Sequence, residues 1–512
     1  MIAALGLAFL SGFIALSYEI LWYRAFSFAS GTAANTFGLL LGAYLLGLAL
    51  GVLAVRSVCR DSDAAARSLQ LAFLVRLIVF ANVIGFLVVP CLGWLMTAGA
   101  TRTWSLVAVG VAAAGLGTVF PLLSHLAIEP DDHAGRRVSY VYLTNILGST
   151  AGSLGTGFVL MDHLSLAATH LLLFFLGLAM AMLPLFLDTG RPRTVALAAI
   201  GVLGLAGALF GTKPFDGIYE KLQLKTEYTR ERRFKHVVET RSGVITVNEK
   251  DQIFGGGIYD GAFNTRLYPD KNLILRCYAA ISELHPAPRE VLMIGLSSGS
   301  WATVVANHPG VTRLTVIEIN PGYLGLIRQY PDVAGLLTNP KVEIHIDDGR
   351  RWLTRNADRK FDAVLANTTF HWRSNASNLL SVEFLELIRS HLNPGGFYFY
   401  NTTDSLRVAK TGCSVFKNAL MIAKFIAVGD SSLAVDPSRL RERLLDYPLG
   451  TGTVFDRNNP EDLRRLDEVT ANLRKLLRTR EQILSGCPEG LRLITDDNMG
   501  TEWGEGTQIL IP

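Results

Sequence analysis

Long apolar runs with few charges fill the first 210 residues, and they constrain the fold more than any other feature of the chain. A helix needs about 20 predominantly apolar residues to cross the hydrocarbon core of a membrane. Runs of this kind lie at 2–22, 33–55, 71–97, 104–128, 141–163, 166–187 and 194–211, of which the last is the shortest. The sequence therefore predicts a transmembrane helical domain of about seven spans over residues 1–212.

Small residues are dense at 38–51 and 148–157, where glycines recur about every four residues. This spacing lets two helix backbones approach closely in lipid. We therefore expect tight helix packing at these positions, with a path for a substrate as the alternative.

Glu19 lies near the end of the first apolar run, where a carboxylate is costly unless it is paired or used. Three interpretations stay open. Glu19 forms a pair with Arg24, or it anchors the membrane interface together with Trp22 and Tyr23, or it faces a polar cavity that receives the head group of a substrate.

From residue 213 onward, charged and apolar residues mix as they do in a soluble globular protein. The formal net charge of +4 is too small for 512 residues to indicate a nucleic-acid partner. The chain has five scattered cysteines, without a CxxC motif or a Cys/His spacing typical of metal sites: Cys59, Cys91, Cys277, Cys413 and Cys487. We expect free thiols and no metal.

The soluble part divides into two predicted segments. Residues 213–284 combine a linker with a β-rich subdomain, because apolar residues alternate between Gly-rich turns at 236–263. Over 285–512, strand and helix signals alternate from VLMI through TRLTVIEI, VEIHIDD and FDAVLAN to GGFYFYN. This alternation predicts an α/β domain with a doubly wound, parallel sheet.

Three strand ends of this domain carry the residue types of a nucleotide site. The turn GLSSGS, residues 295–300, lets the backbone approach a ligand, and the helix that follows offers unpaired N–H groups. Glu318 ends the second strand, where an acid can accept hydrogen bonds from both ribose hydroxyls. Asp347 and Asp348 end the third strand, where an acid can bind the exocyclic amine of adenine. The alternative is an α/β domain whose site is empty or vestigial.

With these motifs, residues 240–405 resemble the spermidine synthase family within the class I methyltransferase-like (Rossmann-like) fold. HPAPR before VLMIG, then IEIN, DDGRRWL and LNPGGF, occur in the family's order. The first half is similar to the helices of bacterial membrane proteins fused to spermidine synthase-like domains, through SGFIALSYEILWYRAFSF, FGLLLGAYLLGLALG and TNILGSTAGSLGTGF. The stretch ASNLLSVEF and the closing ITDDN are similar as well.

The resemblance implies a donor, S-adenosylmethionine or its decarboxylated form, and a set of residues that bind it as a co-substrate. These residues are Gly295, Ser297, Gly299, Glu318, Asp347 and Asp348.

The loop after the fourth strand departs from the family's pattern. Family members commonly carry Asp-Ser-Ser-Asp-Pro there, and the first Asp helps position and deprotonate the attacking amine. Here the loop is NTTFHW, residues 367–372, with Asn367 in the place of that Asp. Two of four positions also resemble the Asn-Pro-Pro-Tyr/Phe loop of amine methyltransferases, where an amide orients the nucleophile. The family's Tyr-Gln/His-Glu cluster falls near residues 273–275, and the glycine loop lacks its usual Asp.

These losses matter because a diamine is a dication at neutral pH, and a dry site needs carboxylates to hold and deprotonate it. The groups that we consider as replacements are His371, Asp260, Asp496, Asp497 and Glu502. An imidazole is a suitable base near neutral pH, but an ordinary loop histidine is an equal interpretation of His371. A turn or a helix cap is the alternative for Asp496 and Asp497.

The leading hypothesis is a membrane-embedded alkyl transferase, for aminopropyl or methyl groups, that acts on an amine or a membrane-associated acceptor. Its catalytic candidates are Asn367, His371 and Asp260. The lipid bilayer and a small-molecule or membrane-borne acceptor are its expected partners, and a homodimer stays open. The alternative is a transporter or sensor that binds an adenosyl compound or polyamine without chemistry. Spermidine synthesis of the soluble type is a third interpretation.

The resemblance places the protein in the bacterial inner membrane. Two arguments about its orientation there disagree. The even-numbered connections hold most of the arginines, namely Arg56, Arg60, Arg67, Arg136, Arg137, Arg191 and Arg193. Arg24 and Arg102 lie in odd-numbered ones. This favours a cytoplasmic N-terminus, and seven spans would then put the soluble domain outside. An adenosyl donor is made inside the cell, so we expect the soluble domain in the cytoplasm.

Overall fold

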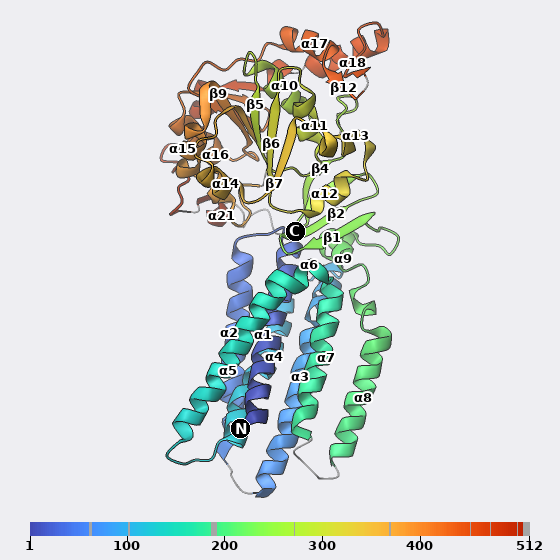
Figure 1. Ribbon diagram of the computed structural model, residues 1–512, viewed down its shortest axis with the longest axis vertical. Coiled ribbons are helices and arrows are strands. Elements are labelled where there is room, and N and C mark those ends of the chain that lie inside the picture. Colours follow the sequence, from blue (N-terminus) through green and yellow to red (C-terminus); the bar gives the residue numbers. More distant parts are fainter. Residues whose placement is uncertain are drawn as a thin grey trace. The chain divides into compact units, whose positions relative to one another are not determined.

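The computed structural model describes residues 1–60, 64–100, 103–185, 192–270, 272–367, 370–450, 452–471, 473–498 and 500–504. The chain divides into two compact units (Figure 1). The first comprises Met1–Gly31 and Asn35–Val244, and the second comprises Thr32–Ala34 and Ile245–Pro512.

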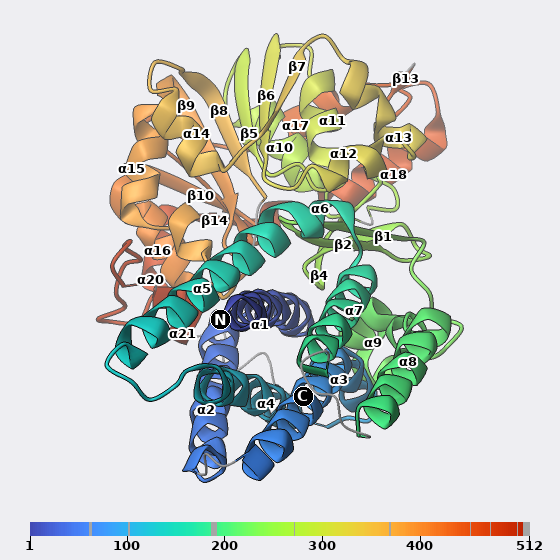
Figure 2. The ribbon, with the colours of Figure 1, turned by 60° about the horizontal axis from the view of Figure 1, so that its bottom comes forward.

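Long antiparallel helices make up the first unit. In the described part they are α1 (Ile2–Ala29), α2 (Asn35–Val55), α3 (Ala64–Thr97), α4 (Thr103–Ala127), α5 (Ala134–Gly155), α7 (Leu166–Leu185) and α8 (Pro192–Phe210). A π-helical turn at Thr156–Leu160 and the short helix α6 (Met161–His163) follow α5. Helix α1 contacts α2, α3, α4, α5 and α7, so it is the central helix of the bundle (Figure 2).

Five of the described helices are long and apolar enough to cross a membrane: Ile2–Ala29, Asn35–Val55, Ser68–Thr97, Trp104–Ala127 and Leu166–Leu185. A sixth span arises if Thr194–Phe210 and Lys213–Glu227, which are bent by 45°, count as one. The predicted span at 141–163 does not meet this test, because α5 carries polar residues such as Asn145, Ser149 and Ser153. Seven spans therefore stay a prediction.

Some glycines of α5 and α2 lie where helices touch, whereas Gly38 and Gly42 on α2 have nothing within 4 Å of an added Cβ. A Cβ atom on Gly148 would come within 2.0 Å of the carbonyl oxygen of Phe9, and one on Gly152 within 2.3 Å of that of Phe13. On α2, a Cβ on Gly51 would come within 2.0 Å of the carbonyl oxygen of Ala114. Backbone approaches this close need glycine, so these positions serve helix packing.

The predicted pair of Glu19 and Arg24 is wrong. Residues five apart on a helix point about 140° away from each other. Arg24 is buried and lies 3.6 Å from the carboxylate of Glu239, which also accepts hydrogen bonds from the N–H of Leu166 and the hydroxyl of Tyr219. Trp22 is likewise inside the bundle, where its indole N–H donates to the carbonyl oxygen of Gly85 at 3.0 Å. No hydrogen bond or ion pair of Glu19 exists within the described ranges, so its role in a polar cavity stays a prediction.

Four strands follow the helices along the chain. They are β1 (His236–Thr240), β2 (Gly243–Val247), β3 (Gln252–Gly255) and β4 (Ile258–Ala262), and they form one sheet in that order. Strand β3 pairs antiparallel with both β2 and β4. A helix, α10 (Leu275–Glu283), follows and leads into the main sheet.

The main sheet confirms the predicted doubly wound architecture. Its order is β14-β10-β11-β9-β8-β5-β6-β7. The parallel strands are β5 (Glu290–Ile294), β6 (Arg313–Glu318), β7 (Val342–Ile346), β8 (Phe361–Ala366) and β9 (Leu392–Asn401). The antiparallel pairs at the other edge involve β10 (Asn418–Ile422), β11 (Phe425–Gly429) and β14 (Leu477–Thr479).

Helices cover both faces of this sheet (Figure 2). On one face α14 (Gly349–Arg355), α15 (Val382–Ser390) and α16 (Leu406–Val415) contribute to a large apolar core. On the other, α10 packs against α11 (Ser300–Asn307) and α17 (Pro437–Leu445). The chain moves outward from β5 in both directions, to β6 and to β8, so the strand order reverses beside β5. Ligands of such sheets bind outside the carboxyl ends of the strands at this reversal.

Candidate functional site

The turn after β5 has the backbone of a ligand-binding loop. Gly295 and Gly299 have φ angles of 90° and 76°, and Ser297 has a φ of 49°. Gly299 caps α11, and a Cβ atom there would lie 3.0 Å from Ile327. The left-handed φ and this close contact explain why glycine occupies the position. A turn with left-handed residues thus joins β5 to the start of α11, and the sequence predicts this strand, turn and helix.

Glu318 lies directly beside this loop, at the end of β6. Its carboxylate is buried and accepts hydrogen bonds from the backbone N–H groups of Leu296 and Asn320, both at 2.7 Å. Burial raises the pKa of Glu318 although these hydrogen bonds act in the opposite direction. The side chain therefore fixes the loop through Leu296, and its predicted contact with a ribose stays a prediction.

The two acids after β7 have partners of their own. Asp348 caps α14 by accepting a hydrogen bond from the N–H of Arg351 at 2.8 Å. Asp347 forms an ion pair with Arg351 and lies 3.8 Å from Arg355. The N–H of Asp347 also donates to the carbonyl oxygen of Glu318 at 3.0 Å, which joins the ends of β6 and β7. A contact of either acid with adenine stays a prediction.

Asp260, on β4, reaches the same place from outside the main sheet. Its carboxylate accepts a hydrogen bond from the hydroxyl of Tyr323 at 2.5 Å, and its carbonyl oxygen accepts one from the hydroxyl of Ser297 at 2.6 Å. Asp260 is partly exposed, yet the surrounding protein removes much of its water. This burial raises the pKa of Asp260 to about 7, helped by the charge of Glu318 and opposed by the hydrogen bond from Tyr323 and by the charge of Arg373.

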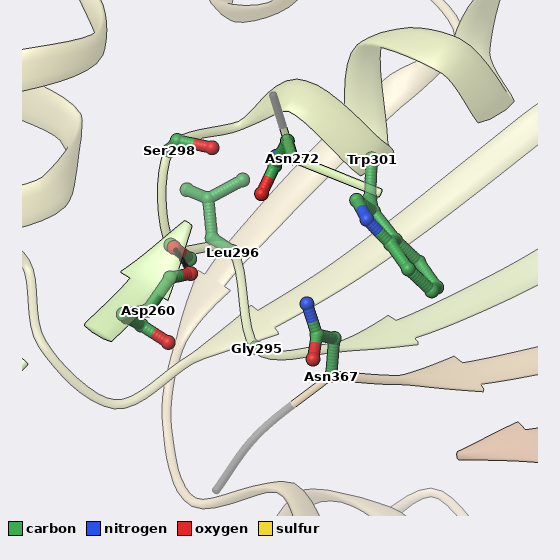
Figure 3. Close-up of a pocket in the computed structure, with 8 residues that line it drawn as sticks. Asp260, Asn272, Gly295, Leu296, Ser298, Trp301 and Asn367 are labelled. Carbon is green, nitrogen blue, oxygen red and sulfur yellow. Dashed lines mark hydrogen bonds between the residues drawn. The ribbon is translucent and has the colours of Figure 1, made fainter. Parts of the chain in front are cut away.

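A pocket opens between these elements (Figure 3). Its cavity volume is about 10 Å³, which is room for about one water molecule. The residues that line it are Asp260, Asn272, Gly295, Leu296, Ser297, Ser298, Trp301 and Asn367. The pocket thus brings together three predicted regions: the glycine loop, Asp260 and the end of β8. Residues 368 and 369 of the predicted loop lie outside the described residues.

The other proposed replacements for the missing carboxylates do not line this pocket. The imidazole Nδ1 of His371 lies 2.6 Å from the hydroxyl of Thr403. Asp496 accepts hydrogen bonds from Arg350 and Ser381, and Glu502 accepts them from the backbone N–H groups of Asn375 and Ser377. Asp497 is exposed.

Several residues at the site were not predicted from the sequence: Asn272, Trp301, Tyr323 and Arg373. Tyr323 follows Glu318 closely in the chain, so its position after the second strand was a usable signal. Trp301 is the second residue of α11, where a bulky side chain can turn back over the loop. Arg373 is near Asp260 only through the fold. Its guanidinium donates to the hydroxyl of Thr32 at 2.8 Å.

Similar proteins indicate the class to which this site belongs. Residues 280–425 match the spermine/spermidine synthase domain. A polyamine aminopropyltransferase of Desulforudis audaxviator is 29% identical over 140 residues, which are 26% of this chain and 50% of that protein. Those of Oceanobacillus iheyensis and Mycobacterium tuberculosis are 23% and 27% identical over 310 and 308 residues, or 56% of this chain and 56% and 57% of theirs.

The chain spans about half the length of the curated relatives it matches. Among solved structures, a spermidine synthase in complex with the transition-state analogue AdoDATO is 15% identical with a TM-score of 0.36, covering 47% of this chain and 88% of that one. Human methyltransferase-like protein 13 in complex with SAH is 20% identical with a TM-score of 0.28, covering 37% and 95%. The sheet has a doubly wound α/β architecture with its glycine loop at the reversal of the strand order. Residues 280–425 match the spermine/spermidine synthase domain, and through this domain the chain is similar to the spermidine synthase-like family.

Proposed function

We propose that the protein transfers an alkyl group from an S-adenosyl donor to an amine or another nucleophile. The observation that carries this proposal is the buried Glu318, which ties down the loop at residues 295–299 beside the reversal of the strand order. A loop held in this way offers backbone N–H groups and a carboxylate to the polar parts of a nucleoside. The names of the relatives support transfer of the aminopropyl type.

The reaction needs little besides positioning, because a sulfonium is already a good leaving group. In the proposed step, the lone pair of the amine attacks the carbon next to the sulfonium. The carbon–sulfur bond breaks, its electron pair stays on sulfur, and a neutral thioether leaves. The proton of the amine moves to the carboxylate of Asp260. A carboxyl group with a pKa of about 7 is suited to take up this proton near neutral pH.

Asn367 would act differently from the Asp that family members carry in its place. Its amide oxygen can accept a hydrogen bond from the amine, but the amide cannot take a proton. We assign the proton to Asp260 and the orientation of the nucleophile to Asn367. Both residues line the same pocket.

The helices would anchor the enzyme in a bacterial inner membrane and bring it to a membrane-borne or small-molecule acceptor. Five helices that are long and apolar enough to cross a membrane support this part of the proposal. The soluble unit would lie in the cytoplasm, where the donor is made.

Donor binding tests the proposal directly. Methylthioadenosine would be titrated calorimetrically into the full-length protein in detergent, and the same titration would be repeated with Glu318→Gln. We expect the variant to lose about tenfold or more in affinity, because an amide cannot replace both the loop contacts and the ribose contacts of the carboxylate. Glu343→Gln is the matched control, since Glu343 is an exposed acid on β7. Equal affinity in Glu318→Gln and the wild type would refute the assignment of the site.

Turnover separates a transferase from a binding protein. The wild type would be incubated with a donor and with cell membranes, and the adenosyl thioether by-product would be measured. A transporter or sensor would bind methylthioadenosine but release no thioether.

A further inference from the structure

Arg373, in the loop after β8, is held in place by a residue from the start of the chain. Its guanidinium donates a hydrogen bond to the hydroxyl of Thr32 at 2.8 Å. The main chains pair as well, because Ala33 forms an antiparallel bridge with Arg373 and the N–H of Ser374 donates to the carbonyl oxygen of Thr32 at 2.8 Å. Residues 32–34 lie between α1 and α2 in the chain and belong to the second unit. The position of the guanidinium therefore depends on this short segment.

The turn between β3 and β4 brings Arg373 and Asp260 into one cluster. A Cβ atom on Gly256 would lie 2.7 Å from a guanidinium nitrogen of Arg373. A Cβ atom on the preceding residue, Gly255, would lie 2.7 Å from the hydroxyl of Tyr323 and 3.3 Å from the carboxylate of Asp260. Two consecutive glycines thus approach both charged groups, which places the guanidinium and the carboxylate around the same turn.

Three ionisable groups act on the carboxyl group of Asp260: Glu318 at the end of β6, Tyr323 on the short helix α12 (Gly322–Ile327), and Arg373. Asp260 and Glu318 are both hydrogen-bonded to the loop at residues 295–299, so two acids share a small region. Burial and the charge of Glu318 raise the pKa of Asp260, whereas the hydrogen bond from Tyr323 and the charge of Arg373 oppose this rise. Arg373 supplies the positive charge of this set, and a cation near an acid favours its ionised form.

This charge matters because a carboxyl group can take up a proton only from its ionised form. Asp260 has a pKa of about 7, so near neutral pH it is divided between the two forms. Without a cation the protonated form would dominate, and the amine could not be deprotonated there.

We propose that Arg373 is a positioning residue, and that Thr32 holds its positive charge where it stabilises the carboxylate of Asp260. The inference rests on the proposed function, because it takes Asp260 as the proton acceptor. It deepens that function by making the acceptor depend on the segment between the first two helices of the chain. Arg373 and Thr32 make and break no bond in this scheme.

Infrared titration of the full-length protein in detergent tests the proposal without a substrate. The C=O stretch of protonated carboxyl groups would be followed against pH, and the part that is lost in Asp260→Asn belongs to Asp260. Its midpoint in the wild type should lie near pH 7. Arg373→Gln removes the charge but keeps a polar side chain, so the midpoint should rise by about one pH unit or more. Arg373→Lys keeps a positive charge, so its midpoint should stay within about half a unit of the wild type.

A second pair of variants tests the part of Thr32, and it carries the test if Arg373→Gln fails to fold. Thr32 has a left-handed φ of 65°, which is unfavourable for a β-branched residue. Thr32→Ala and Thr32→Ser both remove this branch, so they differ from each other in the hydroxyl group. Thr32→Ala should raise the midpoint by about half a pH unit or more, and Thr32→Ser should leave it unchanged.

An unchanged midpoint in Arg373→Gln would overturn the part of Arg373, and an unchanged or lower one in Thr32→Ala would overturn that of Thr32. Release of the adenosyl thioether, measured with either S-adenosyl donor and cell membranes, separates these failures from failure of the proposed function. In Arg373→Gln, thioether release should rise with pH through the same higher midpoint as the infrared band. Thioether release with unshifted midpoints overturns the inference alone, whereas shifted midpoints without any thioether from the wild type refute the proposed function.

Discussion

Among the residues that line the pocket, Asp260 has a pKa that the fold raises to near neutral pH. The protein around it raises the pKa of its carboxyl group from 3.8 to about 7, so the folded state binds a proton that the unfolded state releases above pH 4. The free energy of unfolding therefore falls as the pH rises from about 4 to about 7. This loss of stability is complete above pH 7 and absent below about pH 4.

Asp260→Asn should remove this dependence on pH, because an amide does not ionise but still accepts the hydrogen bond from Tyr323. We expect the variant and the wild type to have similar melting temperatures at pH 4, and the variant to gain on the order of 1–4 kcal/mol at pH 8. Melting curves of both proteins in detergent between pH 4 and 8 provide the measurement.

Asp332→Asn is the matched control, since Asp332 is an exposed acid on the short helix α13 (Pro331–Ala334). Its melting temperature should follow that of the wild type at every pH. If Asp260→Asn also follows the wild type, the carboxyl of Asp260 titrates in its ordinary range and is not the proton acceptor.

Individual site residues were predictable where the backbone itself demands a residue type. Gly299 has a left-handed φ and a close neighbour, and a glycine turn between a buried strand and a helix reveals such a position. Trp301 carried no comparable signal, because a tryptophan in a helix beside a sheet is usually part of the core. His371 carried a weaker signal, since any histidine in a loop after the fourth strand invites a catalytic interpretation, and its role stays a prediction. The imidazole Nδ1 of His371 lies 2.6 Å from the hydroxyl of Thr403, and His371 does not line the pocket.

At the scale of elements, the central parallel strands were largely readable from the sequence, although their order in the sheet was not predicted. Each of the central strands is a short apolar run between turn residues, and parallel strands buried on both faces have this composition. The partner of Arg24 was not readable. Glu239 is far along the chain and belongs to β1, so no local spacing connects the two residues.

Gly148 and Gly152 of α5 allow this helix to contact α1 closely. A substitution at one of them therefore tests the packing within the helical unit. Gly148→Ala should destabilise the protein by about 1–3 kcal/mol, because the new methyl group would overlap the carbonyl oxygen of Phe9 on α1. Gly42→Ala on α2 is the control: a Cβ there has nothing within 4 Å, and alanine favours the helix.

Thermal unfolding in detergent, followed by circular dichroism, would compare the two variants with the wild type. A lower melting temperature for Gly148→Ala and an unchanged or higher one for Gly42→Ala is the expected pair of results. Should both variants melt together with the wild type, the two helices do not pack closely in solution.

For the whole molecule, the orientation in the membrane depends on whether the number of spans is even or odd. An even number of spans puts the soluble unit on the same side of the membrane as the N-terminus, and an odd number puts it on the opposite side. Five helices pass the test for a span, and the bent pair Thr194–Phe210 and Lys213–Glu227 makes six. With these six spans, Arg56, Arg60, Arg67, Arg136 and Arg137 stay in even-numbered connections, whereas Arg193 falls in the fifth. Most of the arginines and the source of the donor then agree on a cytoplasmic N-terminus and a cytoplasmic soluble unit. Arg102 and Arg191, which also enter the arginine count, lie outside the described residues.

Two single cysteines decide between these arrangements. Lys250→Cys marks an exposed turn between β2 and β3, and Asp132→Cys marks the exposed connection between α4 and α5. Intact spheroplasts would be treated with a membrane-impermeant maleimide, and labelling would be compared with that of permeabilised cells and of the unsubstituted protein. We expect the cysteine at 250 to be protected until the membrane is opened, because the soluble unit must reach a donor made in the cytoplasm.

Residue 132 follows four spans, so it lies on the same side as the N-terminus in both arrangements. Protection at 132 as well as at 250 would therefore put the N-terminus and the soluble unit on the same side, which supports six spans. Labelling at 132 supports seven spans with the N-terminus outside. Labelling at 250 in intact spheroplasts would place the soluble unit outside the cell membrane, and a donor made in the cytoplasm could then reach Trp301 and Asp260 only after export.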